Sequence, residues 1–445
     1  MRTLWFEQAL LPSGWCSSVR FQIEAGRFAG IETDVDPAPR EVRHRTAVPG
    51  TPNLHSHAFQ RLMAGFAEVR SGPAGDDFWS WRDLMYRLVS AISPEDLAAI
   101  AAMAFMEMLE SGFTRTGEFQ YLHHQPDGRA YDDIGEMAGA LAAAAEQTGI
   151  GLTLLPVFYA HAGFGGSPPN VGQRRFVTDI DAFSRLCDAS ARAVSSLPDA
   201  VLGIAPHSLR AVTADELSAL VCMFPDRPIH LHIAEQTKEV SDCLAWSGQR
   251  PVEWLLDRYP IDPHWCLIHA THVTEAECQA VANSGAVVGL CPITEANLGD
   301  GAFPAAAFLT SGGAFGIGTD SNVRIDLGEE LRLLEYGQRL TRRQRTVLAT
   351  PDQSNGRVLF DNVVSGGRTA LAGGAMLRVG EQADLVELAP AVIDTGDRAL
   401  DHWIFGTGRV DRVWRAGQEV VAGGRHRHRG AISERFEAVA RRLLS

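Results

Sequence analysis

The run AVPGTPNLHSH, residues 47–57, ends in two histidines that are separated by one residue. Side chains two positions apart on a strand lie on the same face, so His55 and His57 could bind one metal ion. Taken alone, the pair is weak evidence, because hydrogen-bonded histidines at a polar strand end would give the same pattern. The run becomes informative because it is the first of eight similar apolar runs.

Seven further apolar runs follow, and segments with helical periodicity such as SPEDLAAIAAMAFMEMLESG, residues 93–112, lie between them. This alternation predicts an α/β fold with a parallel sheet, and eight strands allow a closed (β/α)8 TIM barrel. The seven runs, in chain order, are TRTGEFQY, GLTLLPVFY, LGIAPHSL, PIHLHIAE, WCLIHATH, AVVGLCPIT and AFGIGTDSN.

Nearly every run ends in polar residues. In a barrel the active site is built from the C-terminal ends of the strands, so these residues should converge on one rim. They are His55 and His57, Glu118 and Tyr121, His207, His232 and Glu235, His269, and Asp320.

The two ends of the chain have a different texture. Short strand-like runs separated by turns fill residues 3–47, and similar runs return in ADLVELA and RVWRAGQEVVAGG near the C-terminus. We therefore expect a small β-sandwich module formed from both ends. The expected boundaries are residues 1–48 for its N-terminal part, 49–368 for the barrel, and 369–445 for its C-terminal part with a terminal helix.

Composition narrows the class of protein. Hydrophobic residues make up 45% and charged residues 21% of the 445 residues, which fits a globular enzyme with a large core. The net charge of -14 argues against nucleic acid or an anionic membrane as a partner, because both require a basic surface. The expected partner is a small molecule.

Seven cysteines are scattered without a C-x-x-C motif, so we expect reduced thiols rather than a disulfide framework. The first residues show no signal-peptide pattern, and no apolar run reaches the roughly 18 residues of a membrane span. The expected location is the cytoplasm.

Three later runs add candidates for chemistry. PIHLHIAE ends with His232 and Glu235, WCLIHATH contains His269, and AFGIGTDSN contains Asp320. Each has an ordinary structural explanation: Glu235 as a first-turn carboxylate of a helix, His269 as a core histidine, Asp320 as a helix N-cap. The ordered combination with the H-x-H pair favours a mononuclear hydrolytic metal site.

With these residues in place, the chain resembles the amidohydrolase superfamily, in particular its deaminase-like branch with one metal ion. The likeness includes the stretch LRVGEQADLVEL, residues 377–388. The resemblance implies that zinc is bound by His55, His57, His232 and Asp320. It also implies catalytic roles for Glu235, His269 and Asp320, and a homodimer. Iron or manganese would suit the same ligands.

The lysine content supports a single ion. Members of the superfamily with two metals commonly bridge them through a carboxylated barrel lysine. The only lysine of this chain, Lys238, follows the fifth apolar run, at the start of an expected helix.

Within the superfamily, the chain resembles the formimidoylglutamate deiminases of histidine degradation. The blocks that carry this likeness are PNLHSHAFQR, FWSWRDLMYR, EFQYLHH, LLPVFYAHAGFGG, HSLRAVT, HIAEQ, IHATH and LCPITEANLGDG. The resemblance implies that substrate is bound by Gln60, Arg82, Tyr121, His207 and Arg210. One departure is Asn322, where a close relative would be expected to carry histidine, so rim contacts or substrate preference could differ.

The implied reaction is hydrolysis of N-formimino-L-glutamate to N-formyl-L-glutamate and ammonia. Asp320 and His269 would take a proton from water, and Glu235 would protonate the departing nitrogen. A glutamate-derived substrate carries two carboxylates, which arginine forks such as Arg82 and Arg210 bind well. Arg82 could instead be a solvated or structural arginine, because it lies in a Trp-rich stretch.

Two other functions remain open from the sequence. A deaminase of a heterocycle, of the guanine, adenosine or triazine type, would use the same metal ligands but would need aromatic stacking and amide contacts. A barrel that serves as a non-catalytic scaffold would be expected to have lost some ligands, yet all are present.

Overall fold

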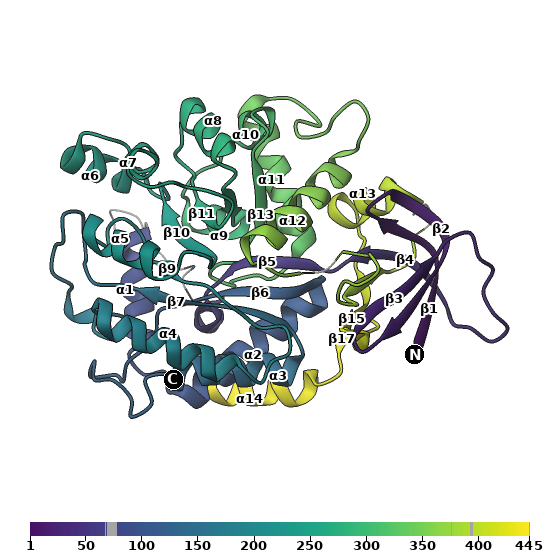
Figure 1. The fold of residues 1–445 in the computed structure, drawn as a ribbon, viewed down its shortest axis with the longest axis horizontal. Coiled ribbons are helices and arrows are strands. Elements are labelled where there is room, and N and C mark those ends of the chain that lie inside the picture. Colours follow the sequence, from purple (N-terminus) through teal and green to yellow (C-terminus); the bar gives the residue numbers. More distant parts are fainter. Residues whose placement is uncertain (67, 69–77, 375, 392–394, 445) are drawn as a thin grey trace.

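The computed structural model describes residues 1–66, 68, 78–374, 376–391 and 395–444. Within these residues the strands form one mixed sheet and two parallel sheets, and helices surround the parallel ones (Figure 1). Both ends of the chain contribute to the mixed sheet, whereas the middle of the chain forms the parallel sheets. The alternation of parallel strands and helices is therefore confined to the middle of the chain.

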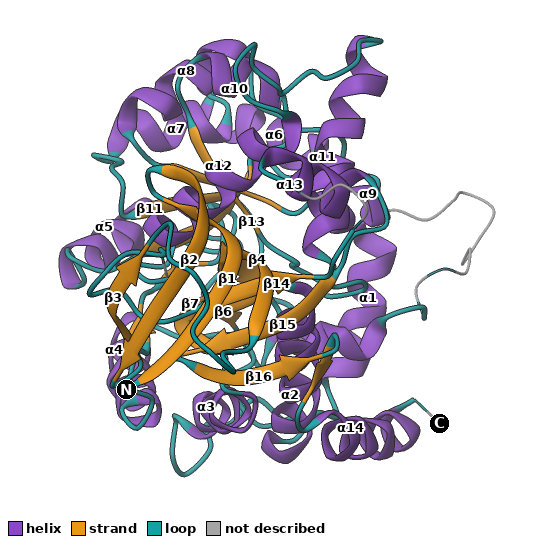
Figure 2. Cartoon of the chain, turned by 90° about the vertical axis from the view of Figure 1, so that its right-hand side faces the viewer, coloured by secondary structure: helices purple, strands orange, loops and turns teal. Residues whose placement is uncertain are grey.

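The mixed sheet has eight strands in the order β17-β16-β15-β14-β4-β1-β2-β3. The two ends of the chain pair with each other in it, as the sequence pattern predicts, because β4 lies between β1 and β14 (Figure 2). Its strands are β1 (Arg2–Leu11), β2 (Gly14–Glu24), β3 (Arg27–Glu32), β4 (Arg43–Pro49), β14 (Leu385–Leu388), β15 (Val410–Arg415), β16 (Gln418–Ala422) and β17 (Arg425–His426).

Each of the eight apolar runs contains a parallel strand. One sheet has the order β5-β6-β7-β8 with β9 paired to β7, and the other has the order β10-β11-β12-β13. Isolated parallel bridges, Ser56–Asp320 and Ile204–Ile229, connect the edges of the two sheets. The strands are β5 (Thr51–Ser56), β6 (Phe113–Gln120), β7 (Gly151–Phe158), β8 (Val201–Leu202), β9 (Ala205–Pro206), β10 (Ile229–Ile233), β11 (Trp265–His269), β12 (Val287–Leu290) and β13 (Ala314–Ile317).

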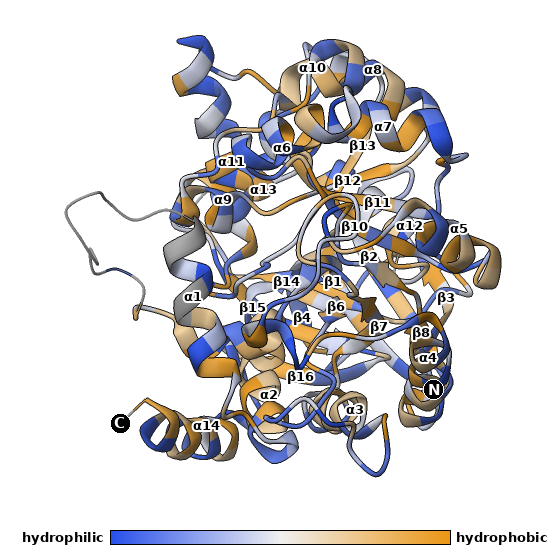
Figure 3. Ribbon diagram, turned by 90° about the vertical axis from the view of Figure 1, so that its left-hand side faces the viewer, coloured by the Kyte–Doolittle hydropathy of each residue, from blue (hydrophilic) through white to orange (hydrophobic). Residues whose placement is uncertain are grey.

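Helices follow most of these strands and turn an apolar face inward (Figure 3). The predicted helix of residues 93–112 is α2, whose N-cap Ser93 forms a capping box with Asp96. The helices are η1 (Ala58–Met63), α1 (Phe78–Val89), α2 (Pro94–Ser111), α3 (Glu136–Thr148), η2 (Val171–Gln173), α4 (Ile180–Val194), α5 (Ala214–Met223), α6 (Thr237–Ser247), α7 (Pro251–Arg258), α8 (Glu275–Ser284), α9 (Pro292–Leu298), α10 (Ala305–Thr310), α11 (Leu327–Arg342), α12 (Asn355–Ala370), α13 (Asp397–Phe405) and α14 (Arg429–Leu443).

Two glycines allow close approach beside the strand that carries the H-x-H pair. A Cβ at Gly50, the one residue between β4 and β5, would lie 2.3 Å from Thr114 Oγ1. A Cβ at Gly318, just after β13, would lie 2.6 Å from the Cβ of His55. The start of β5 can therefore approach β6, and its end can approach the segment after β13, only because these two positions have no side chain.

In the described parts of the chain, no helix combines the length and the apolar character needed to cross a bilayer.

Candidate active site

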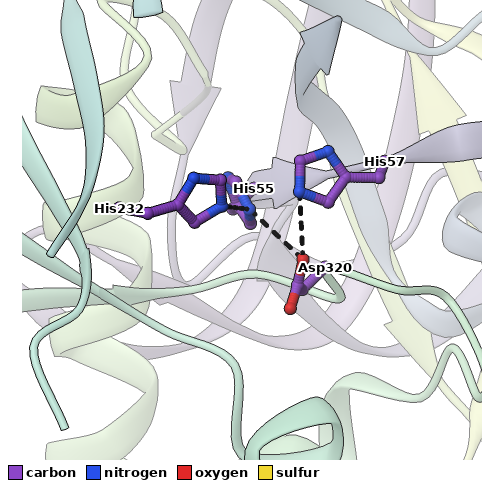
Figure 4. Close-up of side chains that lie close together, drawn as sticks. All are labelled: His55, His57, His232 and Asp320. Carbon is purple, nitrogen blue, oxygen red and sulfur yellow. Dashed lines mark hydrogen bonds and ion pairs between the residues drawn. The ribbon is translucent and has the colours of Figure 1, made fainter. Parts of the chain in front are cut away.

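The four predicted metal ligands meet at one point. His55 and His57 come from the end of β5, His232 from β10 and Asp320 from the turn after β13, and their side chains point toward one another (Figure 4). Their candidate ligand atoms all lie within 4.8 Å of one another. Asp320 Oδ1 is 3.3 Å from the Nε2 atoms of both His55 and His57.

The rings of two of these histidines are fixed by backbone carbonyls. His57 Nδ1 donates to the carbonyl oxygen of Phe119 at 3.1 Å, and His232 Nδ1 donates to that of His207 at 3.0 Å. Each Nε2 is thereby left without a proton and faces the centre. The Nε2 atoms of His55 and His232 are 3.0 Å apart, a spacing that suits two ligands of one ion.

Burial keeps the three imidazoles in the form that binds metal. It lowers the pKa of His57, and it lowers the pKa values of His55 and His232 well below their ordinary value. Neutral imidazole and an ionised carboxylate are the forms that coordinate a cation, so the donor set fits one divalent ion.

Strained backbone is concentrated at the strand ends around this cluster. Ala234, His269, Ala270, Asp320 and Asn322 all have positive φ, between 46° and 65°. Non-glycine residues seldom adopt this conformation, and where they do, the surrounding structure must hold them. Packing around the cluster thus holds these residues in a backbone conformation that is unfavourable by itself, and this conformation sets the direction of their side chains.

The two predicted catalytic partners lie beside the ligands. His269 ends β11, and its Nε2 atom is 3.8 Å from Glu235 Oε1 and 3.8 Å from Asp320 Oδ2. Glu235, His269 and Asp320 are all buried. A proton could therefore move between these three groups over short distances.

Burial and charge set the protonation of these partners. Burial raises the pKa of Glu235 to about 7, although His269 and Arg210 work in the opposite direction. Burial opposes charge on His269, but the facing carboxylates, Glu235 first among them, outweigh it and raise the pKa of His269 to about 10. Glu235 can thus gain and lose a proton near neutral pH, which a general acid or base requires.

The five residues predicted to bind substrate line one pocket together with three of the four candidate metal ligands. They come from η1, α1, the end of β6 and the segment after β9, and the pocket leads to His57, His232 and Asp320. The five are Gln60, Arg82, Tyr121, His207 and Arg210. All the site residues predicted from the sequence are therefore brought together.

Polar groups converge in this pocket. Gln60 Nε2 donates to Tyr121 Oη at 2.9 Å, while its buried Oε1 has no partner in the described chain. Arg210 Nη2 lies 3.7 Å from Glu235 Oε2 and 4.0 Å from Glu239 Oε2. The guanidinium of Arg82 lies 5.4 Å from the centre of the Tyr86 ring. The pocket thus offers two cations to an anionic ligand.

Sequence reasoning missed several wall residues. Met85 and Tyr86 follow Arg82 by three and four positions on α1, and this helical spacing could have identified them. Tyr159 follows β7 just as Tyr121 follows β6, which is a second usable signal. The remaining additions, for which no signal was available, are Trp81, Phe176 and Leu298.

Asn322 supports the ligand loop and is not among the residues that line the pocket. Its Nδ2 donates to Ser56 Oγ at 3.1 Å, to the His57 carbonyl at 3.1 Å and to the Asp320 carbonyl at 3.0 Å. It therefore ties the segment that carries the H-x-H pair to the turn that carries Asp320. Asn322, which replaces the expected histidine, therefore supports the backbone beside the candidate metal ligands and does not shape the pocket.

Lys238 lies away from the metal ligands. It is in the first turn of α6, is exposed, and its Nζ is 2.6 Å from Asp242 Oδ2. It cannot supply a carboxylated lysine to the cluster, so the geometry agrees with the expected single ion.

Comparison with known proteins places these features in context. The Amidohydrolase family matches residues 46–360, and "Formimidoylglutamate deiminase HutF, N-terminal domain" matches residues 1–45. The formimidoylglutamate deiminase of Pseudomonas aeruginosa is 48% identical over 454 aligned residues, covering 100% of both chains.

Solved structures show the same fold. An amidohydrolase from Brucella melitensis has 51% sequence identity, covers 100% of both chains and superposes with a TM-score of 0.97. An adenosine deaminase from Xanthomonas campestris with bound zinc covers 99% of this chain and 98% of its own, with a TM-score of 0.82 and 22% identity. The second likeness concerns the fold alone.

Proposed function

This chain belongs to the amidohydrolase family, and from that premise we propose that it is a formimidoylglutamate deiminase. The reaction is hydrolysis of N-formimino-L-glutamate to N-formyl-L-glutamate and ammonia. The observation that carries the proposal is a pocket with a His3Asp cluster and two arginines, in a chain that matches a curated formimidoylglutamate deiminase along its whole length.

For the fold, we infer a closed (β/α)8 barrel in residues 49–368. The two parallel sheets and the bridges between their edges support closure. Residues 1–48 and 369–445 would form the β-sandwich module around the mixed sheet. The inferred boundary at residue 368 falls inside α12, which ends at Ala370.

We infer that the residues of the cluster hold one divalent ion, with zinc as the first choice. The ligands are His55, His57, His232 and Asp320. When bound, such an ion supplies Lewis acidity, which lowers the pKa of water and polarises the formimino group. Three imidazole nitrogens and one carboxylate oxygen would be the donors, and both donor types are ones that zinc binds.

The chain's own residues then move the protons. Asp320 accepts a proton from the attacking water, and His269, whose Nε2 lies 3.8 Å from Asp320 Oδ2, orients that water. A C–O bond forms at the formimino carbon. Protonated Glu235 gives its proton to the terminal nitrogen as the C=N bond becomes a single bond. The proton that Asp320 took from water then passes to the same nitrogen, the hydroxyl group returns a proton to Glu235, and the C–N bond breaks, so that ammonia leaves as the C=O bond forms. With a pKa near 7, Glu235 suits this transfer at neutral pH.

The remaining pocket residues bind the glutamate part. Arg82 and Arg210 neutralise the two carboxylates, because guanidinium forks bind carboxylates through paired hydrogen bonds. Gln60, Tyr121 and His207 hold the segment nearer the formimino group. Homodimerisation and a cytoplasmic location stay predictions, and light scattering on the purified protein tests the first.

The proposal is tested by ammonia release from N-formimino-L-glutamate, compared with N-formimino-L-aspartate, purines, pterins and cytosine. Protein stripped with a chelator and reloaded with zinc, iron or manganese gives the metal dependence. We expect efficient turnover of N-formimino-L-glutamate only, with one ion per chain. Faster turnover of a heterocycle would replace the proposal by a ring deaminase, and absence of stoichiometric metal would point to a scaffold.

A further inference from the structure

His269 is in contact with a carboxylate that has no part in the reaction described above. Glu295 lies in the first turn of α9 and is buried. Its Oε1 atom is 3.3 Å from His269 Nδ1, and the same oxygen accepts the backbone N–H of Cys291 at 2.9 Å. The backbone contact fixes the carboxylate oxygen, so the imidazole meets a stationary acceptor.

This contact determines which nitrogen of His269 faces the reaction. An ionised carboxylate can only accept hydrogen bonds, so the proton of the contact must be on Nδ1. The other nitrogen, Nε2, then points toward Glu235 and Asp320, each 3.8 Å away. Without an acceptor at Nδ1, the ring could rotate away from this direction.

The carboxylate is itself held relative to the metal ligands. The N–H of Ile293, in the same helical turn, donates to Glu330 Oε2 at 2.8 Å. Thr294 Oγ1 lies 2.9 Å from Ser321 Oγ, and Ser321 follows Asp320 directly. The start of α9 is thus joined on one side to α11 and on the other to the ligand turn.

The backbone of His269 makes such support necessary. Its φ of 65° is in the left-handed region, which side chains other than glycine seldom adopt. A strand end in this conformation does not by itself fix the direction of the imidazole. A contact beyond the strand must do so.

We propose that Glu295 is a positioning residue, which accepts the Nδ1 hydrogen of His269 and so keeps Nε2 directed at the reacting atoms. This inference rests on the proposed function, because it concerns how His269 serves that reaction. It adds a second buried carboxylate with a task separate from that of Glu235.

A different assignment of the same atoms makes a different prediction. The candidate ligand atoms of His269, Cys291 and Glu295 also lie within 4.8 Å of one another and could hold a second ion. A second ion would raise the metal content to two per chain in the wild type. The hydrogen-bond assignment requires one per chain, and requires that number to stay unchanged when Glu295 is replaced.

The experiment compares Glu295→Ala and Glu295→Gln with Glu330→Gln, which alters a buried carboxylate of α11 that contacts the same start of α9 through the Ile293 N–H. Each is made alone and with His269→Ala. For Glu295→Ala we expect kcat to fall about 10–100-fold, with unchanged KM and metal content. Glu295→Gln should recover most of the rate, because its amide oxygen can still accept the hydrogen.

The double variants separate positioning from folding. Once His269 is alanine, Glu295→Ala should cause no further loss, whereas any effect of Glu330→Gln should persist. Equal losses from Glu295→Ala in both backgrounds would overturn the proposal. So would two ions per wild-type chain of which one is lost in Glu295→Ala.

A measurement without substrate tests the contact between Glu295 and His269 independently of the proposed function. In protein with 15N-labelled histidine, the Nδ1–H resonance of His269 is assigned by its absence in His269→Ala. We expect it to disappear or shift in Glu295→Ala and to persist in Glu330→Gln. If the wild type fails to release ammonia from N-formimino-L-glutamate, the proposed function fails. An unchanged resonance in Glu295→Ala would overturn the inference whatever the substrate.

Discussion

The two ends of the pocket are built differently. At the metal end, strand ends present the ligands and backbone carbonyls fix the rings of His57 and His232. At the far wall, side chains hold one another: Gln173, the last residue of η2, donates through Nε2 to the hydroxyl of Tyr159, which follows β7, at 2.6 Å. Main-chain carbonyls thus hold two of the candidate ligand rings, whereas contacts between side chains hold the far wall. Substitutions at the metal end should therefore abolish activity, whereas substitutions at the far wall should reduce kcat/KM by smaller factors.

The largest effect is expected from His232→Ala. It removes one of three nitrogen ligands, so we expect a loss of kcat/KM of about 10⁴-fold or more together with loss of bound metal. Metal analysis and steady-state ammonia release measure both. The matched control is His230→Gln, because His230 lies two residues earlier on the same strand but bonds to the Ala370 carbonyl at 2.8 Å instead of joining the candidate ligands. If His232→Ala still bound one metal ion per chain, the assignment of His232 as a ligand would be wrong.

At the far wall, Arg210→Met should be the most damaging change. Loss of a charged hydrogen-bonding partner of a carboxylate costs about 1.5–3 kcal/mol, so we expect kcat/KM to fall roughly 10–100-fold, mainly through KM, with metal retained. Arg210→Lys should recover part of the loss, because it keeps the charge without the fork. If Arg210→Met and Arg82→Met both leave KM unchanged, carboxylate binding by these arginines is wrong.

A smaller effect is expected from Gln173→Leu. Gln173 is buried, its Oε1 accepts the N–H of Asn170 at 2.8 Å, and its Nε2 contacts the hydroxyls of Tyr159 and Tyr86. Loss of one or two such bonds is worth about 1 kcal/mol, so KM should rise about fivefold while kcat stays close to that of the wild type. Gln125→Leu, outside the pocket lining, is the control. A fall in kcat without a change in KM would contradict a role in substrate fit.

The smallest effect concerns stability beneath the metal end. Burial raises the pKa of Glu118 from an ordinary 4.5 to about 8. Protonation of Glu118 therefore increases the free energy of unfolding. This contribution is complete below about pH 4.5 and is lost as the pH rises through about 8. Glu118→Gln cannot titrate, so its melting temperature relative to wild type should rise by a few degrees between pH 5 and pH 8. A difference that is independent of pH would refute this assignment.

The metal end could be predicted almost completely from the sequence. Parallel strands place their C-terminal ends on one rim, so the position of a histidine or aspartate at a strand end already assigns it to that rim. This rule places the four candidate ligands, Glu235 and His269 at the same rim. The family resemblance then supplied the roles, including those of Arg82 and Arg210.

The far wall and the supporting contacts could be predicted only in part. Phe176 and Gln173 lie in a long connection between β7 and α4, where no periodicity fixes the direction of a side chain. Glu295 has the sequence context of an ordinary acidic residue near a helix start, and only the fold brings it to His269. Asn322 looked like a change at the substrate, whereas its amide contacts backbone.

The short link at Gly50 has a consequence for how the protein is made. β4 continues through this one residue into β5, and β4 pairs on its far side with β14, whose residues leave the ribosome long after those of the H-x-H pair. Until then the strand that leads into the site has an unpaired edge, the kind of surface that invites wrong pairing during synthesis. The first two candidate ligands therefore obtain their complete structural neighbourhood only after β14 has been synthesised.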